Sequence, residues 1–415
     1  MNLSAELDRW LEPETREVLV RVGSCAASLG FRAFLVGGPV RDLLLGRTSL
    51  DFDVVVEGDA LAVATAVAAP GEPAAVTHPA FGTATISAER FRIDLASARA
   101  ETYERPGSLP VVRPGTIKQD LVRRDFTINA MALTLDGGHR GELLDLYGGR
   151  DDLKRGLLRV LHDNSFVDDA TRIVRGVRYE QRFGFTFETH TLELLRTGLP
   201  YLDCISPDRV RHELERTFAE DEPEQAFARL DTLGVLGAIH SALSFDRQKE
   251  TALMQARTSV FPSTRSDAVK WCLLTWGMSA AGIDSLSARL NLPRRVRDAA
   301  ASAAGLLLLE PRLDNPLLSR SDLFALLHGF SHSALLAAEL MFVLPAARAH
   351  VALYIHHLCH VRCALTGVDL RALGVSDGPE MGRILDCLRD ARLNDEIASR
   401  ADELNLARRL CDSLR

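Results

Sequence analysis

Two aspartates separated by one residue, Asp51 and Asp53, are the first candidates for chemistry in this sequence. They begin the alternating run DFDVVVEG (51–58), which predicts a strand, and residues two apart on a strand point to the same face. Neighbouring carboxylates repel unless a cation lies between them, and Mg²⁺ prefers such oxygen ligands. Asp94, in the strand-like run FRIDLASA (91–98), could supply a third carboxylate. The alternative is a set of solvated aspartates, because this spacing is common.

A pair of glycines ahead of these carboxylates could form a cradle for phosphate. Gly37 and Gly38 end the apolar run AFLVGG and open a short helix that carries Arg41. Glycines let the backbone approach a phosphate, helix N–H groups face the anion, and a guanidinium adds charge-assisted donors. By itself such a pair is usually only a turn. Together with the two carboxylates that follow, it completes the minimum arrangement for phosphoryl transfer.

The segment RRDFTINA (123–130) adds further candidates for binding a nucleotide. Its paired arginines, which include Arg124, could hold a triphosphate. Asn129 could contact a ribose hydroxyl, or it could be a helix cap or a buried structural amide. No residue in these segments suggests a covalent nucleophile, and phosphoryl transfer at carboxylate-bound metal requires none. The residues therefore point to phosphoryl transfer with Mg²⁺ as the cofactor.

These candidates fall in an N-terminal part of mixed α/β character. Residues 5–29 are predicted to form one helix, and the prolines and glycines of 99–118 predict a long mobile loop. From about residue 150, strand signals nearly vanish and Leu/Ala/Arg periodicity predicts helices to the C-terminus. We therefore expect one α/β domain followed by an all-helical remainder. The expected strands are 33–36, 51–58, 83–88 and 91–98.

The composition excludes several classes of protein. About 47% of the 415 residues are apolar and 25% are charged, which indicates a globular fold rather than disorder. No apolar run reaches the roughly 18 residues of a membrane span, and the N-terminal segment lacks the core of a signal peptide. Seven scattered cysteines favour a reducing cytoplasm over a disulfide framework. Neither a membrane nor DNA is an expected partner.

A cluster of histidines and cysteines leaves two interpretations open. The apolar segment VALYIHHLCHVRCAL (351–365) predicts one packed helix, in which two pairs of these side chains are spaced i,i+4. That spacing could bind a metal, although short matches of this kind often arise by chance. The cluster comprises His356, His357, Cys359, His360 and Cys363.

Taken in order, the segments above and several later ones resemble the class II (bacterial-type) tRNA nucleotidyltransferase and poly(A) polymerase family, which includes the CCA-adding enzymes. Their order along nearly the whole chain makes the resemblance specific. The segments are LVGGPVRDLLLG (35–46), DFDVV (51–55), RRDFTINAMAL (123–133), DLYGGRDDLKRGLLRVL (145–161), SFVDDATRIVRGVRYEQRFGF (165–185), SPDRVRHELERTF (206–218) and LTGVDLRALGVSDGPEMGRIL (365–385).

The resemblance implies an α+β nucleotidyltransferase head of polymerase-beta-like fold, followed by an all-α neck, body and tail. It implies that the head is catalytic, that the neck selects the nucleotide and binds RNA, and that the tail binds tRNA. The expected boundaries are 1–150 for the head, 151–245 for the neck, 246–365 for the body and 366–415 for the tail.

The segment DDATR begins at Asp168, where the family often has Glu, and resembles the motif by which the family reads bases without a template. Asp169 and Arg172, three apart on a predicted helix, would lie side by side. A carboxylate only accepts hydrogen bonds and a guanidinium only donates them. The pair therefore suits cytosine and adenine, and leaves buried groups unpaired against uracil or guanine. By resemblance, Arg175 and Arg178 approach the triphosphate or base, unless this is a surface ladder of ion pairs.

Members of this family add CC, A or the whole of CCA. By resemblance, CC-only enzymes have a shortened loop before the RRDF motif, and the corresponding stretch here, 99–120, is full length. We therefore expect the 3′ end of tRNA as partner and CTP and ATP as substrates, with full CCA addition or A-only addition both open. A poly(A) polymerase is less expected because no long basic extension is present. An inert RNA-binding homologue is disfavoured because all three carboxylates are present.

The net charge of −7 conceals basic segments. Residues 251–300 carry seven cations against three anions, and residues 99–124 carry six against three. Arginine contacts to phosphate dominate RNA affinity, so we expect tRNA to bind along these segments. Codon bias is the alternative, because only four of the 49 basic residues are lysine. The RNA-binding residues expected in the body are Arg289, Arg294, Arg295 and Arg297.

Overall fold

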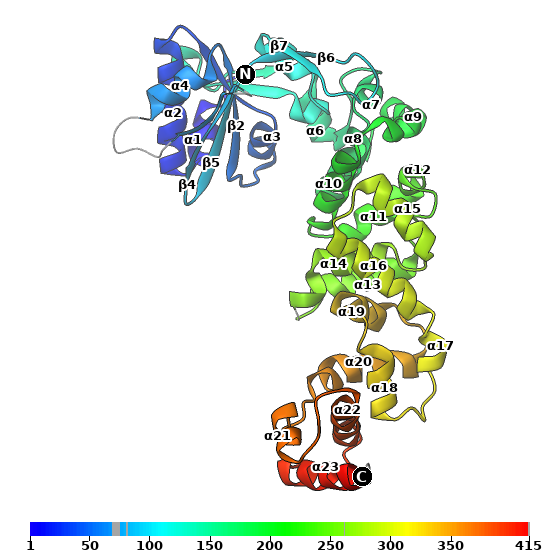
Figure 1. The fold of residues 1–415 in the computed structure, drawn as a ribbon. Helices are drawn as coiled ribbons and strands as arrows, with labels where there is room; N and C mark the ends of the chain where they lie inside the picture. Colours follow the sequence, from blue (N-terminus) through cyan, green and yellow to red (C-terminus); the bar gives the residue numbers. More distant parts are fainter. Residues whose placement is uncertain (69–74, 80–81, 261, 414–415) are drawn as a thin grey trace. The chain divides into compact units, whose positions relative to one another are not determined.

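The chain folds into two compact units in the computed structural model, which describes residues 1–68, 75–79, 82–260 and 262–413. The predicted head and neck fall mainly in the first unit, and the predicted body and tail in the second (Figure 1). The division into four parts stays a prediction. The first unit is Met1–Glu222 with Thr232–Ile239, and the second is Pro223–Asp231 with His240–Arg415.

A mixed seven-stranded sheet organises the first unit. The strand order is β3-β4-β5-β2-β1-β8-β9, and β2 and β5 are parallel neighbours while the other pairs are antiparallel. The four expected strands are confirmed, and β3, β8 and β9 were not expected. The strands are β1 (Arg32–Val36), β2 (Asp51–Glu57), β3 (Ala75–His78), β4 (Thr83–Ala88), β5 (Phe91–Ser97), β8 (Met131–Thr134) and β9 (Leu143–Asp145).

Helices α1 (Ser4–Trp10), α2 (Pro13–Ser28) and α4 (Ala60–Val67) gather on one side of this sheet (Figure 1). The prediction of one helix over residues 5–29 is therefore wrong. Pro13 begins α2 and has no N–H to continue α1, and its ring would clash with the preceding turn of a continuous helix. The break lets α2 pack against both α4 and β1.

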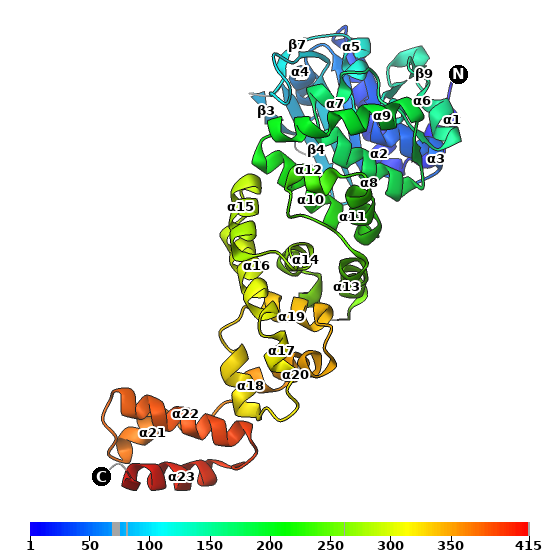
Figure 2. The ribbon, with the colours of Figure 1, turned by 90° about the vertical axis from the view of Figure 1, so that its right-hand side faces the viewer.

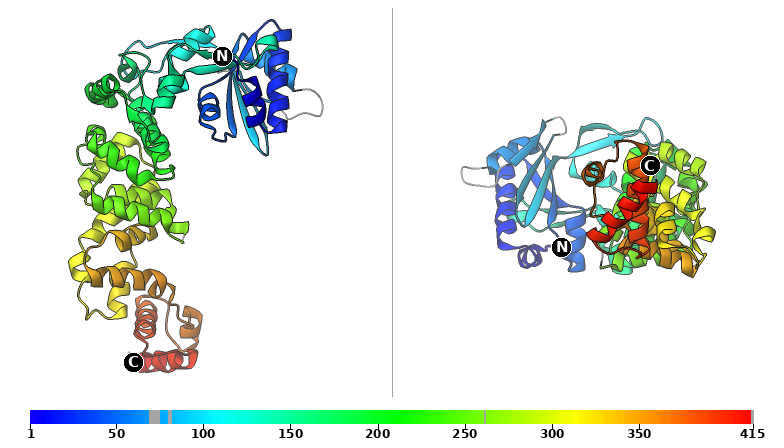
Figure 3. Two further views of the ribbon diagram at one scale, coloured as in Figure 1. Left: turned by 180° about the vertical axis from the view of Figure 1, so that it is seen from behind. Right: turned by 60° about the horizontal axis from the view of Figure 1, so that its bottom comes forward.

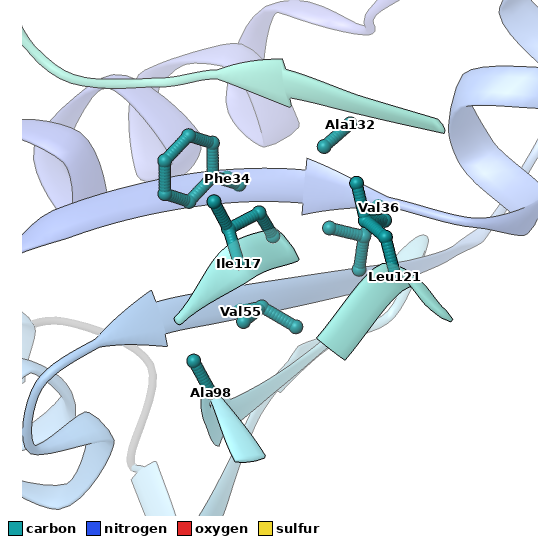
Figure 4. Close-up of a cluster of buried hydrophobic side chains, with 7 residues drawn as sticks. All are labelled: Phe34, Val36, Val55, Ala98, Ile117, Leu121 and Ala132. Carbon is teal, nitrogen blue, oxygen red and sulfur yellow. The ribbon is translucent and has the colours of Figure 1, made fainter. Parts of the chain in front are cut away.

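On the face of the sheet that carries Asp51 and Asp53, the acidic side chains lie at the start of β2 and the apolar side chain of Val55 lies farther along the strand. Val55 belongs to a buried cluster that Ile117 and Leu121 of α5 (Ile117–Val122) complete (Figure 4). The two aspartates precede Val55 at alternate positions and are exposed. Helix α5 thus covers one end of this face and leaves the acidic end accessible. The buried cluster is Phe34, Val36, Val55, Ala98, Ile117, Leu121 and Ala132.

The stretch 99–118 is not the irregular loop that its prolines predicted. Strands β6 (Arg99–Thr102) and β7 (Val111–Pro114) pair antiparallel as a separate ribbon. Thr116 then begins α5 with a capping box, in which Thr116 and Gln119 bond to each other's backbone. Both strands are short and β7 is exposed throughout, so neither carries the alternation by which a sequence reveals a strand.

The predicted neck packs closely on the head within the first unit. Gly176 on α8 lies so close to the rings of Phe126 and Phe187 that a Cβ would fall within 2.8 Å of both, and α8 also packs against α10. Phe126 in turn meets Tyr179 edge to face. The remaining elements of the unit are α3 (Gly38–Leu45), α6 (Gly149–Arg155), β10 (Leu157–Leu158), α7 (Ser165–Asp168), α8 (Thr171–Phe183), β11 (Thr186–Phe187), α9 (Thr189–Gly198), α10 (Pro207–Phe218) and α12 (Val235–Ile239).

The regular elements described in the second unit are all helices, as predicted (Figures 2 and 3). In the predicted neck, the short parallel pair β10 and β11 departs from the prediction of an all-helical remainder. No single helix in the described part of the chain is long and apolar enough to cross a membrane, and α18 with α19, bent by 116°, passes that test only as a pair. The helices are α11 (Pro223–Thr232), α13 (Arg247–Thr258), α14 (Asp267–Leu274), α15 (Ala280–Leu290), α16 (Arg294–Leu307), α17 (Glu310–Leu313), α18 (Arg320–Leu327), α19 (His332–Met341), α20 (Pro345–His356), α21 (Gly367–Ala372), α22 (Pro379–Leu393) and α23 (Arg400–Ser413).

The histidine and cysteine cluster does not lie on one helix. Helix α20 ends at His356, His357 leaves the helical conformation, and a short 3₁₀ helix follows over Leu358–His360. The predicted i,i+4 pairs therefore do not share a helical face. Among the described residues, no group of three or more His, Cys, Asp or Glu side chains is placed to hold a metal ion.

Candidate functional site

One polar cavity of about 1260 Å³ gathers almost all of the predicted site residues, and every residue that lines it belongs to the first unit. Ordinary small-molecule pockets occupy about 300–1,000 Å³, so this one has room for more than one small ligand. Of the predicted residues of the head and neck, only Arg178 does not line it. Those that do are Gly37, Gly38, Arg41, Asp51, Asp53, Asp94, Arg124, Asn129, Asp169, Arg172 and Arg175.

The three carboxylates lie on one face of the sheet. Strand β5 runs parallel to β2 and places Asp94 level with Asp53, while Asp51 lies two residues earlier. Asp94 already has partners, because its Oδ1 accepts a hydrogen bond from Thr85 Oγ1 at 2.6 Å and its Oδ2 pairs with Arg92 at 3.0 Å. The arrangement offers Asp51 and Asp53 as the exposed pair, with Asp94 held beside them.

The electrostatics of this face favour a cation. Desolvation raises the pKa of Asp53; Arg124 opposes that rise, while the negative charges of Asp94 and Asp51 add to it. Such a carboxylate is destabilised in its charged form. A bound cation would offset both the desolvation of Asp53 and its repulsion by the neighbouring carboxylates. Mg²⁺ is commonly held by one or two carboxylates together with substrate phosphates. The oxygen donors of Asp51 and Asp53 fit that ion.

Gly37 shapes the cradle next to the carboxylates. It follows β1 and precedes α3 with φ 73° and ψ −126°, a conformation that favours glycine. A Cβ on Gly37 would lie 2.6 Å from Nη1 of Arg124, so the missing side chain lets this guanidinium rest on the backbone. Nε of Arg124 is buried and has no hydrogen-bond partner in the described structure. The cradle therefore contains a donor that an anionic ligand can satisfy.

Asp120 on α5 fixes both arginines of the RRDF segment, and the sequence reasoning missed it. It is fully buried; its Oδ1 accepts from Arg123 at 2.7 Å and its Oδ2 from Arg124 at 3.0 Å. The available signal was spacing, because residues three and four apart on a helix are neighbours. The carboxylate orders two guanidinium groups at the wall of the cavity.

A buried chain of polar groups runs from the head into the neck. Asn129 accepts from Arg41 at 2.7 Å and donates to Asp125 at 2.9 Å, and Asp125 accepts from Arg175 of α8 at 2.6 Å. Burial alone would raise the pKa of Asp125, but Arg175 and Asn129 hold it at about 2. Asn129 is thus a buried structural amide that also lines the cavity. Its contact with a ribose remains a proposal.

Asp169 and Arg172 both line the cavity, but they do not form the predicted pair on one helix. Asp169 has an extended backbone (φ −145°) between α7 and α8, and its Oδ1 accepts from the backbone N–H and hydroxyl of Thr171. Arg172 instead donates to Ser165 Oγ at 2.6 Å and to the carbonyl oxygen of Arg123 at 2.7 Å. The prediction failed because α8 begins at Thr171, so Asp169 lies before the helix, where its carboxylate can accept from a nearby backbone N–H.

Arg178 does not line the cavity. Its side chain is buried and pairs with Glu213 at 2.7 Å and Glu220 at 2.9 Å, both within the first unit. Arg178 therefore forms ion pairs, as the alternative for this residue expected, but these pairs are buried rather than on the surface. Other basic or aromatic residues on α8 and α10 line the cavity, and the sequence did not predict them as site residues. The segment SPDRVRHELERTF, which forms α10, had contributed only to the family resemblance. These additional lining residues are Tyr179, Arg182, Arg209, His212 and Arg216.

The four arginines expected to bind RNA lie in the second unit. Arg289 is in the last turn of α15, and the other three occupy the first turn of α16. Asp298 pairs with Arg294 at 3.4 Å and with Arg297 at 3.1 Å. Cations in a first turn oppose the helix dipole, so the dipole does not account for Arg294 and Arg295.

Comparison with known proteins places these features in a family. Residues 33–159 match the Poly A polymerase head domain, and residues 184–245 match the probable RNA and SrmB-binding site of polymerase A. The A-adding tRNA nucleotidyltransferase of Geobacter sulfurreducens is 35% identical over 98% of this chain. That match covers 48% of the relative, so this chain spans about half of its length.

Two further proteins match over nearly their full length. The CC-adding tRNA nucleotidyltransferase of Deinococcus radiodurans is 36% identical, over 90% of this chain and 88% of the relative. The structure of the Thermotoga maritima CCA-adding enzyme complexed with tRNA is 28% identical with a TM-score of 0.78, over 100% of this chain and 99% of that one. This chain belongs to the tRNA nucleotidyltransferase and poly(A) polymerase family.

Proposed function

We propose that this chain transfers CMP and AMP from CTP and ATP to the 3′ end of tRNA and thereby completes or repairs the terminal CCA. The observation that carries the proposal is the placement of Asp51 and Asp53 in one cavity with the Gly37 cradle and a wall of arginines. In the reaction, the terminal 3′ hydroxyl oxygen bonds to the α-phosphorus, the bond from that phosphorus to the bridging oxygen breaks, and pyrophosphate leaves.

Asp51 and Asp53 would hold the metal of this reaction, which we propose is Mg²⁺. When bound, the ion lowers the pKa of the attacking hydroxyl and neutralises charge on the leaving pyrophosphate. Asp94 is held level with Asp53 by Thr85 and Arg92, and we propose that it accepts the proton of the hydroxyl, because no three carboxylate side chains among the described residues are placed to hold a metal together. No covalent enzyme intermediate is required.

The remaining side chains would bind and orient the nucleotide. Arg124 presents a buried donor beside Gly37, which suits a phosphate oxygen, and Arg41 is held next to the cradle by Asn129. Arg175 lines the same cavity while Asp125 fixes it. At the neck side, Asp169 and Arg172 would contact the base, each held by its own protein partners. Fixed donors act without the cost of reorganising around the reacting group.

Addition of A alone is the second candidate, because the relative from Geobacter sulfurreducens carries that activity in its name. One assay separates the candidates. tRNA substrates that end before CCA, after C and after CC are each incubated with labelled CTP or ATP. Full CCA addition predicts CMP on the first two and AMP on the third, and A-only addition predicts AMP on the third alone. If CMP is added and AMP is not, the activity is CC addition; no addition to any substrate contradicts the proposal.

We propose that tRNA also contacts the first turn of α16. Charge reversal of Arg294 and Arg295 to Glu is expected to weaken tRNA binding by about tenfold or more, and to flatten its salt dependence by about one unit of slope per lost phosphate contact. Arg294 is 88% exposed, so the fold should tolerate the change. Filter binding at several salt concentrations measures both effects. Arg312→Glu, at the end of α17, is the control, and unchanged affinity of the double variant would exclude this contact.

The proposed compartment is the cytoplasm. Its support is the scattered set of cysteines, none of which forms a disulfide in the described structure.

A further inference from the structure

Arg209, on the first turn of α10, contacts the residue proposed to read the base. Its Nη2 lies 2.7 Å from Oδ2 of Asp169, and both side chains line the cavity. The other carboxylate oxygen of Asp169 accepts from the hydroxyl of Thr171 at 2.6 Å and from its backbone N–H at 3.0 Å. Two elements, α8 and α10, therefore hold the two oxygens of one carboxylate.

These restraints leave Asp169 a fixed direction in which to accept another hydrogen bond. A carboxylate offers about four acceptor positions, and three are engaged by Thr171 and Arg209. The backbone at Asp169 is extended rather than helical, so helix geometry does not orient this side chain. Without the guanidinium, only Thr171 would restrain the carboxylate, and rotation would let its acceptors move relative to a bound base.

We propose that Arg209 is a positioning residue that sets nucleotide specificity by holding Asp169. This inference rests on the proposed function and names a residue that increases the preference for cytosine and adenine over uracil and guanine. With Arg209 in place, Asp169 faces the exocyclic amine of cytosine or adenine and meets a carbonyl oxygen of uracil or guanine as a repulsive partner. Arg172 is tied to Ser165 and Arg123 and supplies its donors independently.

The test is Arg209→Gln, assayed with CTP, ATP, UTP and GTP on tRNA. We expect the ratio of kcat/KM for CTP over UTP, and for ATP over GTP, to fall by about tenfold, the size of one charge-assisted hydrogen bond. Arg209→Lys should restore part of the ratio, because an ammonium can pair with the carboxylate but cannot reproduce the guanidinium geometry. A structural role alone would lower activity with all four nucleotides without changing these ratios.

Arg211→Gln is the matched control. Arg211 lies two residues along α10 and pairs with Asp208 and Glu215, and it does not line the cavity. Its removal should leave the ratios unchanged. The inference is overturned if Arg209→Gln keeps the wild-type ratios, whether or not it weakens all four nucleotides equally.

Direct binding separates this inference from the proposed function. Dissociation constants of the four nucleotides are measured by titration of the full chain with each one, for the wild type and both Arg209 variants. A wild type that adds no nucleotide contradicts the proposed function, while a loss of base preference in binding on Arg209→Gln still supports the inference. Unchanged preference in binding by an active enzyme contradicts the inference alone.

Discussion

Replacing Asp53 by Asn is expected to lower the rate of nucleotide addition by about 10³-fold or more, because the side chain would no longer hold the cation that stabilises the transition state. Asn keeps the shape of the residue and removes its charge. The same change at Asp51 should have a similar effect, since the two side chains share one face of β2. The rate is measured with saturating ATP and CTP on the tRNA substrate that the wild type extends.

The stability of this variant provides an independent check. The pKa of Asp53 is raised in the folded protein, chiefly by desolvation. A raised carboxylate pKa means that the charged form disfavours folding, so the wild type gives up some stability as the pH rises through that pKa. Asp53→Asn should therefore melt at or above the wild-type temperature near neutral pH. A lost activity with an unchanged or higher melting temperature points to chemistry rather than to misfolding.

Glu89→Gln is the matched control for the two aspartates. It removes one carboxylate charge from an exposed position in the turn between β4 and β5, outside the cavity. Its activity should equal that of the wild type. If Asp53→Asn and Asp51→Asn each also keep wild-type activity, the assignment of the metal-binding pair is wrong.

The second large effect is expected at Asp125, whose loss should destabilise the first unit. Asp125 is 7% exposed and neutralises Arg175, so Asp125→Asn leaves the guanidinium with only Glu213, at 3.9 Å, as an acidic partner. Breaking a buried ion pair costs about 3–5 kcal/mol, and we expect the lower end of that range, about 3 kcal/mol, because the Arg175 side chain is 31% exposed. The measurement is the free energy of unfolding from denaturant titration near neutral pH.

The pH dependence of that loss identifies its cause. The pKa of Asp125 falls from 3.8 to about 2 on folding. A depressed carboxylate pKa contributes stability that is complete above 3.8 and is lost as the pH falls toward about 2. The difference between the wild type and Asp125→Asn should therefore stay constant from neutral pH to about pH 4 and shrink as the pH falls further toward about 2. A difference that stays constant with pH would mean that packing, not charge, stabilises this site.

A change at an exposed carboxylate of the same unit controls for general effects of charge. Asp163 pairs with His190, and its side chain is 77% exposed. Exposed ion pairs contribute about 0–1 kcal/mol, so Asp163→Asn should leave the unfolding free energy nearly unchanged.

Because Asp125 also links Asn129 to Arg175, Asp125→Asn should in addition raise KM for the nucleotide.

Local patterns were enough to predict much of this protein. The alternation of DFDVVVEG implied that Asp51 and Asp53 share one face of a strand, and the glycine pair implied a tight turn before a helix. Both follow from dihedral preferences and side-chain periodicity within a few residues. The order of the motifs along the chain likewise indicated the family.

Contacts between segments far apart in the chain were not predictable in this way. The pairing of Asp169 with Arg209, of Asp125 with Arg175, and of Asp94 with Thr85 each depends on how separate elements pack. Periodicity also misplaced Arg178, because i,i+3 spacing describes a helix surface without saying which neighbour covers it. Packing of α10 against α8 directs Arg178 to Glu213 and leaves Arg175 at the cavity wall. Residue types and spacing thus specified the chemistry, and burial between distant elements selected which charged groups remain available to a substrate.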